Sequence, residues 1–471
     1  MIDKFPKSNR RAILKSAACG FGSLALSGLC EESQASLSQN PLAAKPAHRP
    51  AKAKRVIFIF MQGGPSQVDT FDPKARLTKD DGKTLEFYNA RNRRIQQQRL
   101  QKSPWNFHQY GDAGLWISDL FPEQAKVADD LCVIRSMQTE GVAHGPATLF
   151  LHTGATNLVR PSVGAWVMYG LGTENRNLPG FITINAPPTK GGPRNYSNAF
   201  LPTHFQGTTI GRAGQPMKNA KIEHLVNKTM SREMQRRQFE LLQALNREQK
   251  KAAAQDERLD AVIDSFELAF RMQTHAPAVM DLSKESKQTL EMYGIGEKPT
   301  DDFGRQCLLA RRFAEADVRY IQISYSDLKA TPKWDQHSNL KEHAKHALAT
   351  DKPVAALIAD LKQRGLLEDT LVWWGGEFGR TPFAQGRDGR DHNPKGFSIW
   401  LAGGGVKSGH VHGETDEFGY KAVKDKVHMH DLHATILHLL GLNHERLTYR
   451  YAGRDFRLTD IAGNVVKEVI A

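Results

Sequence analysis

Cysteine is scarce in this chain of 471 residues, which contains only four. Cys19 and Cys30 fall in the first 35 residues, so Cys132 and Cys307 remain for the rest of the chain. Two cysteines allow at most one disulfide, which excludes a small scaffold built on disulfide bridges. The chain must instead fold around a hydrophobic core, and its length allows one large α/β domain or two to three smaller ones.

Long apolar runs are lacking as well. No segment has eighteen consecutive apolar residues, so no membrane-spanning helix is expected. The sequence has no internal repeat and no long low-complexity tract. It also lacks a Gly-x-Gly-x-x-Gly motif after its first apolar run, which argues against a dinucleotide-binding oxidoreductase. No basic-aromatic stripe or nucleic-acid motif is present, so no nucleic-acid partner is expected.

The N-terminus carries the features of an export signal. Arg10 and Arg11 precede a mildly apolar stretch at residues 16–29, which is too short to span a bilayer. Ser33, Gln34 and Ala35 then form a small-x-small cleavage site. These features predict a signal over residues 1–35 that is read by the twin-arginine translocase and directs the protein to the periplasm or the extracellular space. The alternative is an ordinary secretory signal with a chance arginine pair.

Residues 36–54 predict a disordered linker, because they are rich in Ala, Pro, Ser and Lys and lack aromatic residues. The folded domain is then expected at residues 55–471. The whole chain has a formal charge of +13, and about +11 remains when the predicted signal is left out. A basic surface attracts anions such as sulfated glycans, phosphate esters and envelope polymers. General solubility without a specific partner explains the same charge equally well.

Short apolar runs alternate with helical patterns along the rest of the chain. The runs predict buried strands at residues 55–61, 130–135, 318–323, 369–374 and 397–402. Helical periodicity is strongest at residues 344–364 and 431–441. This alternation predicts an α/β fold with a mostly parallel sheet between helical layers. Residues 222–298 are charged and almost free of glycine, which predicts a helical insertion.

Carboxylates, imidazoles and guanidiniums follow the predicted strands, where ligand sites collect in α/β sheets. The candidate metal ligands are Asp69, Asp335, His337, Glu377, Asp391 and His392. Mixed imidazole and carboxylate ligands suit Zn²⁺, Mn²⁺ or iron, whereas carboxylate-rich sites suit Mg²⁺ or Ca²⁺. Arg380 and Arg390 have the forked donors that clamp an oxyanion. Turn formation and an ion-pair network are the structural alternatives.

The order of these motifs resembles the alkaline phosphatase superfamily, which includes sulfatases, phosphomutases and phosphodiesterases. More closely, residues 55–471 resemble an uncharacterised family of exported bacterial proteins grouped near the sulfatases. The similarity is carried by residues 63–74, 376–382, 389–392 and 431–455. It implies an alkaline-phosphatase-like fold and a divalent metal: zinc, manganese, magnesium or calcium.

The resemblance also implies roles for single residues. Asp335 and His337 match the superfamily's middle metal-binding pair, and His392 matches its final histidine. Glu377 matches a later aspartate, but Phe378 stands where a histidine is expected. Asp69 or Gln62 matches the first aspartate, which lies near the end of the first strand.

The chain departs from the superfamily most clearly at the nucleophile, which opens an eleven-residue stretch ending in Thr-Gly. The matching stretch is residues 144–154, which begins with His144 and has Thr148 where sulfatases have arginine. A formylglycine sulfatase is therefore excluded. Either His144 is an additional metal ligand and a metal-activated water attacks, or catalysis has been lost. A covalent route through His144 requires a metal-free imidazole.

The leading prediction is an exported metal-dependent hydrolase of sulfate or phosphate esters. Its substrate is expected to be an anionic small molecule or a polysaccharide ester, with His144, Arg380 and Arg390 as the catalytic groups. The alternative is a non-catalytic envelope protein of the same fold that binds anionic polymers.

Overall fold

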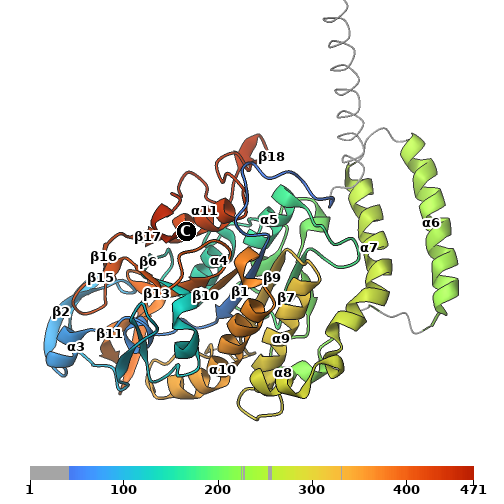
Figure 1. Ribbon diagram of the computed structural model, residues 1–471. Coiled ribbons are helices and arrows are strands. Elements are labelled where there is room, and N and C mark those ends of the chain that lie inside the picture. Colours follow the sequence, from blue (N-terminus) through green and yellow to red (C-terminus); the bar gives the residue numbers. More distant parts are fainter. Residues whose placement is uncertain (1–41, 224, 226–228, 253–256, 330) are drawn as a thin grey trace, which may run out of the picture.

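A mixed sheet forms the centre of the molecule (Figure 1). The computed structural model describes residues 42–471 apart from 224, 226–228, 253–256 and 330, so the predicted signal and residues 36–41 lie outside the described residues. Within the described part of the chain the sheet has nine strands in the order β14-β6-β13-β10-β1-β9-β7-β8, with β17 also paired to β6. Their bounds are β1 (Arg55–Met61), β6 (Leu131–Gln138), β7 (Phe181–Ile184), β8 (Thr208–Ile210), β9 (Tyr320–Tyr325), β10 (Thr370–Gly375), β13 (Phe397–Ala402), β14 (His410–His412) and β17 (Val427–His428).

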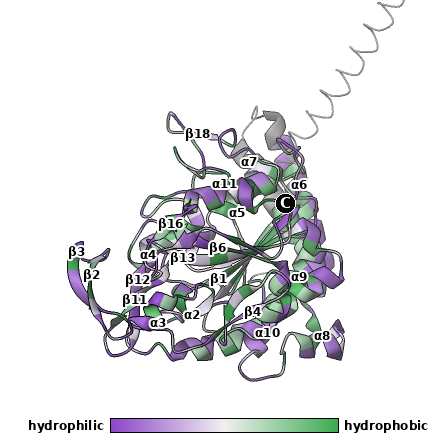
Figure 2. Cartoon of the chain, turned by 60° about the vertical axis from the view of Figure 1, so that its left-hand side comes forward, coloured by the Kyte–Doolittle hydropathy of each residue, from purple (hydrophilic) through white to green (hydrophobic). Residues whose placement is uncertain are grey.

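Helices cover both faces of this sheet because its central strands are apolar on both sides. Along β1, Ile57 and Ile59 enter one hydrophobic cluster, whereas Phe58 and Phe60 enter the other. The first cluster includes α9 (Asp301–Glu315) and α10 (Glu342–Gln363). The second includes α4 (His144–Thr153), α5 (Val163–Leu171) and α11 (Met429–Leu439). Figure 2 shows apolar strands at the centre and polar outer faces on the helices.

The predicted α/β class is confirmed, and all five predicted strands are present as β1, β6, β9, β10 and β13. The two strongest helical patterns form α10 and α11. Strand β13 is antiparallel to both of its neighbours, while the other pairs in the sheet are parallel. The beginning of β13 therefore lies at the same edge as the carboxyl ends of β1, β6, β9 and β10.

Residues 42–54 were expected to belong to the disordered linker, but they lie against the ends of two helices. The Lys45 amide donates to the Leu171 carbonyl at the end of α5, at 2.8 Å. The amides of Lys52 and Ala53 donate to the Leu439 carbonyl at the end of α11, at 2.8 and 2.9 Å. Carbonyls in the last turn of a helix have no partner inside the helix. Backbone groups make these contacts, so the composition of the segment gave no sign of them.

The predicted helical insertion contains α6 (Arg232–Ala252), α7 (Glu257–Met280) and α8 (Lys287–Met292). Helix α7 joins the core through Met272 and Ala276, and α6 lies farther from the sheet (Figure 1). Among the described residues, no helix is both long and apolar enough to cross a membrane. Cys132 and Cys307 are buried free thiols, so the single disulfide that the sequence allows is not formed.

Two short helices and several hairpins surround the edge of the sheet where the parallel strands end. The helices are α2 (Gln67–Thr70) and α3 (Ala75–Lys79). The paired strands near this edge are β2 (Thr84–Asn89) with β3 (Arg94–Arg99), β4 (Phe107–Tyr110) with β5 (Leu115–Ser118), β11 (Gly379–Gln385) with β12 (Gly389–Asn393), and β15 (Glu414–Thr415) with β16 (Ala422–Lys424). The remaining pair, β18 (Tyr449–Tyr451) with β19 (Arg454–Phe456), packs against Tyr169 of α5 and Phe200.

Candidate metal centre

Three imidazoles and one carboxylate meet at the carboxyl edge of the sheet. One ligand atom from each of His144, Asp335, His337 and His392 lies within 4.8 Å of the others. Asp335 is central: its Oδ1 lies 2.8 Å from His337 Nε2 and 3.2 Å from His392 Nε2, and its Oδ2 lies 3.1 Å from His144 Nε2. The cluster thus offers three nitrogen atoms and one carboxylate group to a single point.

The strand ends bring these four residues together. His144 is the first residue of α4, which follows β6. Asp335 and His337 lie in the loop after β9, and His392 lies on β12, just before β13. The carboxyl edge of an open α/β sheet is where loops from separate strands converge. The structure therefore brings Asp335, His337 and His392 together at this edge, as expected from their positions after or before separate strands, and His144 joins them.

The glycines after β1 let two of these loops approach closely. Gly63 has φ +113°, and a Cβ at this position would lie 2.7 Å from the Trp334 amide nitrogen and 2.9 Å from that of Asp335. Gly64 has φ +75°, and a Cβ there would lie 2.5 Å from the Phe378 carbonyl oxygen. Glycine is the residue that tolerates both the backbone conformation and the close approach. The Gly63-Gly64 pair thus allows the backbone at Asp335 and at Phe378 to pack directly against the end of β1.

Each histidine is fixed by a second contact on its other ring nitrogen. His144 Nδ1 is 2.6 Å from Glu377 Oε1, and His392 Nδ1 is 2.8 Å from the Val142 carbonyl. His337 Nδ1 is hydrogen-bonded to Gln385 Oε1. An oxygen acceptor at Nδ1 holds the proton there and leaves the Nε2 lone pair directed away from it. All three Nε2 atoms face Asp335, so their lone pairs converge on the side of the cluster where an ion could be held.

The charges of the cluster favour a cation among these atoms. Burial raises the pKa of Asp335, but the contacts with the imidazoles of His144, His337 and His392 and the charge of Arg380 outweigh this effect, and the pKa is lowered. Burial lowers the pKa of His392 to about 4, despite its contact with Asp335. Because the Val142 carbonyl can only accept a hydrogen bond, a neutral His392 donates from Nδ1 and directs its Nε2 lone pair toward Asp335 Oδ1, so a cation between these two atoms would be stabilised by both.

His144 differs electrostatically from His392. Burial lowers the pKa of its imidazole, but the contacts with Asp335 and Glu377 outweigh this effect and the pKa is raised. Its Nε2 atom is buried and, despite its 3.1 Å approach to Asp335, has no hydrogen bond of acceptable geometry. An aligned metal–ligand bond would satisfy this atom, so the donor set fits a divalent ion.

Glu377 lies behind His144 and does not reach the point where the four groups converge. Its side chain is fully buried, and both carboxylate oxygens accept from the Gly63 amide at 3.1 Å. Oε1 also contacts His144 Nδ1. Glu377 therefore holds His144 in position and is not one of the four converging groups.

Asp69 lies outside the cluster. Both of its oxygens contact Arg390, at 2.7 Å from Nε and 3.1 Å from Nη2, and neither side chain is exposed. The Ser66 hydroxyl also donates to Asp69. Asp391 flanks the cluster: its Oδ1 lies 3.9 Å from His337 Nδ1 and 3.4 Å from Arg91 Nη1.

The two predicted oxyanion-binding arginines are buried and engaged by the protein itself. Arg380 contacts Asp335 at 2.8 Å and donates to the carbonyls of Gly63, Gly64 and Arg390. Arg390 donates to the carbonyls of Thr381, Gln101 and Lys102 besides its pair with Asp69. Such contacts position the loops around the cluster and leave little donor capacity for a substrate.

Phe378, which stands where the superfamily pattern expects a histidine, fills the space beside two of the ligands. Its ring is stacked on His392 with centroids 4.4 Å apart and lies 5.0 Å from His144. Gln385 and the Val142 carbonyl were missed by sequence reasoning. A main-chain carbonyl leaves no mark in a sequence, and the glutamine is recognisable only once β11 is placed beside His337.

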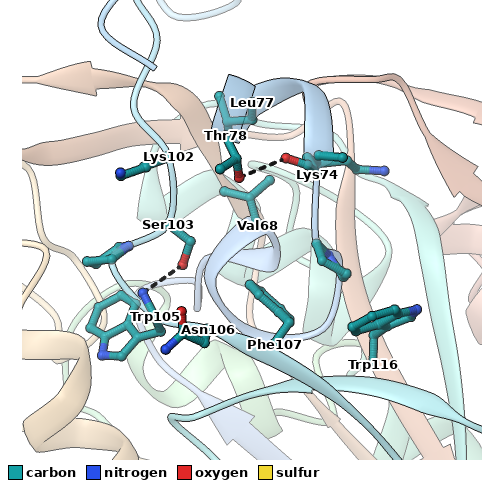
Figure 3. A pocket seen from close by; sticks show the side chains of 13 residues that line it. Val68, Lys74, Leu77, Thr78, Lys102, Ser103, Trp105, Asn106, Phe107 and Trp116 are labelled. Atoms are coloured by element: carbon teal, nitrogen blue, oxygen red, sulfur yellow. Dashed lines mark hydrogen bonds between the residues drawn. The ribbon is translucent and has the colours of Figure 1, made fainter. Parts of the chain in front are cut away.

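A large cavity is lined by Val68, the residue before Asp69, and by Lys102 (Figure 3). It has a volume of about 620 Å³, and its apolar wall includes Val68, Trp105, Phe107 and Trp116. The cavity also includes Lys102, whose carbonyl accepts from Arg390. None of the four converging groups lines this cavity.

A protein-family model described as "Protein of unknown function (DUF1501)" matches residues 53–470. The chain belongs to this family. No curated protein matches it.

Solved structures similar to this DUF1501 chain include sulfatases and phosphatases. A sulfatase from Pseudoalteromonas sp. is 10% identical, with 83% of this chain and 68% of that chain covered and a TM-score of 0.36. The lipoteichoic acid synthase LtaP from Listeria monocytogenes is 10% identical, with 90% and 79% covered and a TM-score of 0.36. A TAB5 alkaline phosphatase variant with bound magnesium is 10% identical, with 83% and 99% covered and a TM-score of 0.35. TM-scores this low do not support transfer of a site from these structures, so the site is assigned from the residues of this chain alone.

Proposed function

We propose that this protein is a metal-dependent hydrolase of sulfate or phosphate esters, with a divalent ion held by His144, Asp335, His337 and His392. The observation that carries the proposal is the convergence of three Nε2 atoms on one buried carboxylate, while each Nδ1 atom has its own oxygen acceptor. Second contacts of this kind are typical of metal-binding histidines.

The donor set favours some metals over others. Three imidazole nitrogens and a carboxylate suit Zn²⁺, Mn²⁺ or iron, whereas Mg²⁺ and Ca²⁺ are usually bound by oxygen atoms alone. When bound, such an ion polarises an ester oxygen and lowers the pKa of water. Zinc and manganese are therefore the first metals to test.

The surrounding residues hold the ligands and control access to them. Glu377 fixes the ring of His144, and Arg380 holds Asp335 through its 2.8 Å contact. The side chains of His144, Asp335 and His392 are 5–8% exposed, whereas that of His337 is 30% exposed. Substrate would therefore reach the cluster on the His337 side.

The same geometry favours one ion and disfavours covalent catalysis by His144. Phe378 offers no ligand atom, and its ring occupies the place beside His144 and His392. His144 Nδ1 is engaged by Glu377, and its buried Nε2 would hold the ion, so neither nitrogen would be free to attack an ester. Export by the twin-arginine translocase to the periplasm or beyond, directed by residues 1–35, is part of this proposal.

The test is metal analysis combined with turnover. Wild-type protein purified without chelators is expected to contain about one zinc or manganese ion, or to accept one on reloading. Asp335→Ala is expected to lose both the metal and hydrolysis of aryl sulfate, phosphate monoester or phosphate diester. The same substitution at Asp112, which lies in the exposed β4–β5 turn, is the control and should retain both.

Two results would contradict the proposal in different ways. If no metal binds to the wild type, the assignment of the cluster fails. If metal binds but no ester of the three classes is hydrolysed, the protein is better described as a non-catalytic binder of anionic polymers.

A further inference from the structure

A second cavity adjoins the metal centre on the side of His337. It has a volume of about 360 Å³ and lies between the β2–β3 hairpin and the β11–β12 hairpin, which are neighbours in Figure 2. Its wall includes Gln385, which is hydrogen-bonded to His337, and Asp391, which lies 3.9 Å from His337 Nδ1. None of the four ligands lines this cavity, but these two wall residues place it next to His337, which is the most exposed of the four.

Carboxamides dominate the wall of this cavity. They are Asn89, Asn92, Gln96, Gln98 and Gln385. Asn92 Nδ2 and Gln98 Nε2 both donate to Gln96 Oε1, at 3.0 and 3.4 Å, so these side chains hold one another in place. A carboxamide has two donor hydrogens and an acceptor oxygen, and these contacts use only part of that capacity.

The charge of the cavity is balanced. Arg91 is paired with Asp391 at 3.4 Å, and both residues belong to the wall. Phe383 and Ala384 are its two apolar members. An apolar ligand would leave many amides without partners, and a strongly charged one would meet no net opposite charge. The chemistry that matches is a neutral group with several hydroxyls, since a hydroxyl both donates and accepts as an amide does.

We propose that this cavity binds the sugar portion of a sulfated or phosphorylated saccharide, with the ester group at the metal centre. This inference rests on the proposed function and adds the substrate class. The volume corresponds to roughly twelve water molecules at about 30 Å³ each, which leaves room for a hexose ring together with bound water. The amides orient the ring, and the contact of Gln385 with His337 links the cavity to the cluster.

Strand β3 supplies a matched control for this proposal. Successive side chains on a strand point to opposite faces, so Gln96 and Gln98 face the cavity while Gln97 faces away. Gln97 Nε2 donates to Glu86 Oε1 at 3.1 Å. Substitution by leucine keeps the approximate size of glutamine and removes its polar atoms. The same change can thus be made on both faces of one strand.

The experiment compares a sugar ester with an aryl ester. The ratio of kcat/KM for glucose 6-sulfate to that for 4-nitrophenyl sulfate is measured for the wild type, Gln96→Leu/Gln98→Leu and Gln97→Leu, with the phosphate pair run in parallel. The double variant is expected to lower the ratio by about ten- to thirtyfold, as expected for two lost neutral hydrogen bonds. Gln97→Leu should leave the ratio within about twofold.

A binding measurement separates this inference from the proposed function. Saturation-transfer NMR with glucose 6-sulfate on metal-free protein requires no turnover, and its signal should weaken in the double variant alone. If the wild type hydrolyses neither ester but this pattern appears, the saccharide site stands and the hydrolase proposal fails. If the aryl ester is hydrolysed and neither the ratio nor the NMR signal changes in the double variant, the inference is overturned. It is also overturned if Trp116→Ala, in the cavity of Figure 3, abolishes saccharide binding instead.

Discussion

Replacing Glu377 by glutamine tests how the protein prepares His144 for a metal. The carboxylate accepts from His144 Nδ1 at 2.6 Å and from the Gly63 amide at 3.1 Å, and it is fully buried. Glutamine has nearly the same shape, but only one of its two terminal atoms accepts a hydrogen bond. The Glu377→Gln variant thus keeps the packing and removes both the charge and one acceptor.

The expected magnitude follows from this change. Removal of a group that orients a metal-binding histidine typically lowers metal affinity by about 10- to 100-fold, or roughly 1.4–2.8 kcal/mol. We expect the upper part of this range, because the lost partner is a charged acceptor at a short distance. His337 and His392 keep their acceptors, so binding should weaken without being abolished.

The assay is competition for Zn²⁺ against a chromophoric chelator at fixed pH, with elemental analysis of the dialysed protein. Glu414→Gln is the matched control. Glu414 forms an exposed ion pair with Lys424, so the same substitution there removes a carboxylate from the surface and not from the cluster. Thermal unfolding of the metal-free variants reports any loss of folding. A Glu377→Gln affinity within threefold of the wild type, with Asp335→Ala still unable to bind zinc, would refute the positioning role.

Three further predictions concern stability and backbone geometry. Gly63→Ala should abolish metal binding, because its Cβ would lie 2.7 Å from the Trp334 amide nitrogen, and dialysis with elemental analysis measures this. Asp69→Asn should lower the free energy of unfolding in urea by about 3–5 kcal/mol, because it leaves the Arg390 charge buried without its partner. Burial lowers the pKa of His433 to about 3 from 6.5, so the stability that its neutral form contributes is complete above pH 6.5 and is lost as the pH falls toward 3. In urea titrations across this window, His433→Gln should reduce the slope of the unfolding free energy against pH by up to about 1.4 kcal/mol per pH unit.

Each of these predictions has a control. Gly82→Ala is the control for Gly63→Ala. Gly82 also has a positive φ, of +80°, but no atom lies within 4 Å of a Cβ built there. Loss of metal in Gly82→Ala would show that backbone strain, and not close contact, is the cause. The pair Asp69→Leu/Arg390→Met should recover much of the stability lost in Asp69→Asn, and failure to do so would point to other losses. His108, with a side chain 58% exposed, is the control for acid sensitivity, and an equal effect of His108→Gln would contradict the assignment to burial.

The sheet could be predicted because its central strands are continuous apolar runs. Strand β1 and strand β10 are buried along their whole length, so neither face needed polar residues. Strands β14 and β17 have three and two residues, too few for a periodic signal. The direction of β13 is not encoded in its apolar pattern, since a strand buried on both faces reads the same in either orientation.

The candidate ligands could be found only in part from the sequence. Asp335, His337 and His392 follow or precede buried strands, so their positions along the chain indicate a shared edge. Asp69 and Glu377 have equivalent positions, yet one pairs with Arg390 and the other with His144. Which carboxylate faces the metal and which supports a neighbour depends on loop conformation over a few ångströms, which residue spacing does not specify.

The three segments that supply the ligands have no common local structure. His144 begins a helix, Asp335 and His337 lie in a loop, and His392 lies on a hairpin strand. The ligand atoms therefore come within 4.8 Å of one another only when β6, β9 and β13 have assembled at one sheet edge. A ligand that binds only the folded state adds RT ln(1 + [L]/Kd) to stability, about 4.1 kcal/mol at a thousandfold excess over Kd. Metal bound here would thus stabilise the sheet as a whole, and the buried charges of Asp335, Glu377 and Arg380 would be balanced only in the complete assembly.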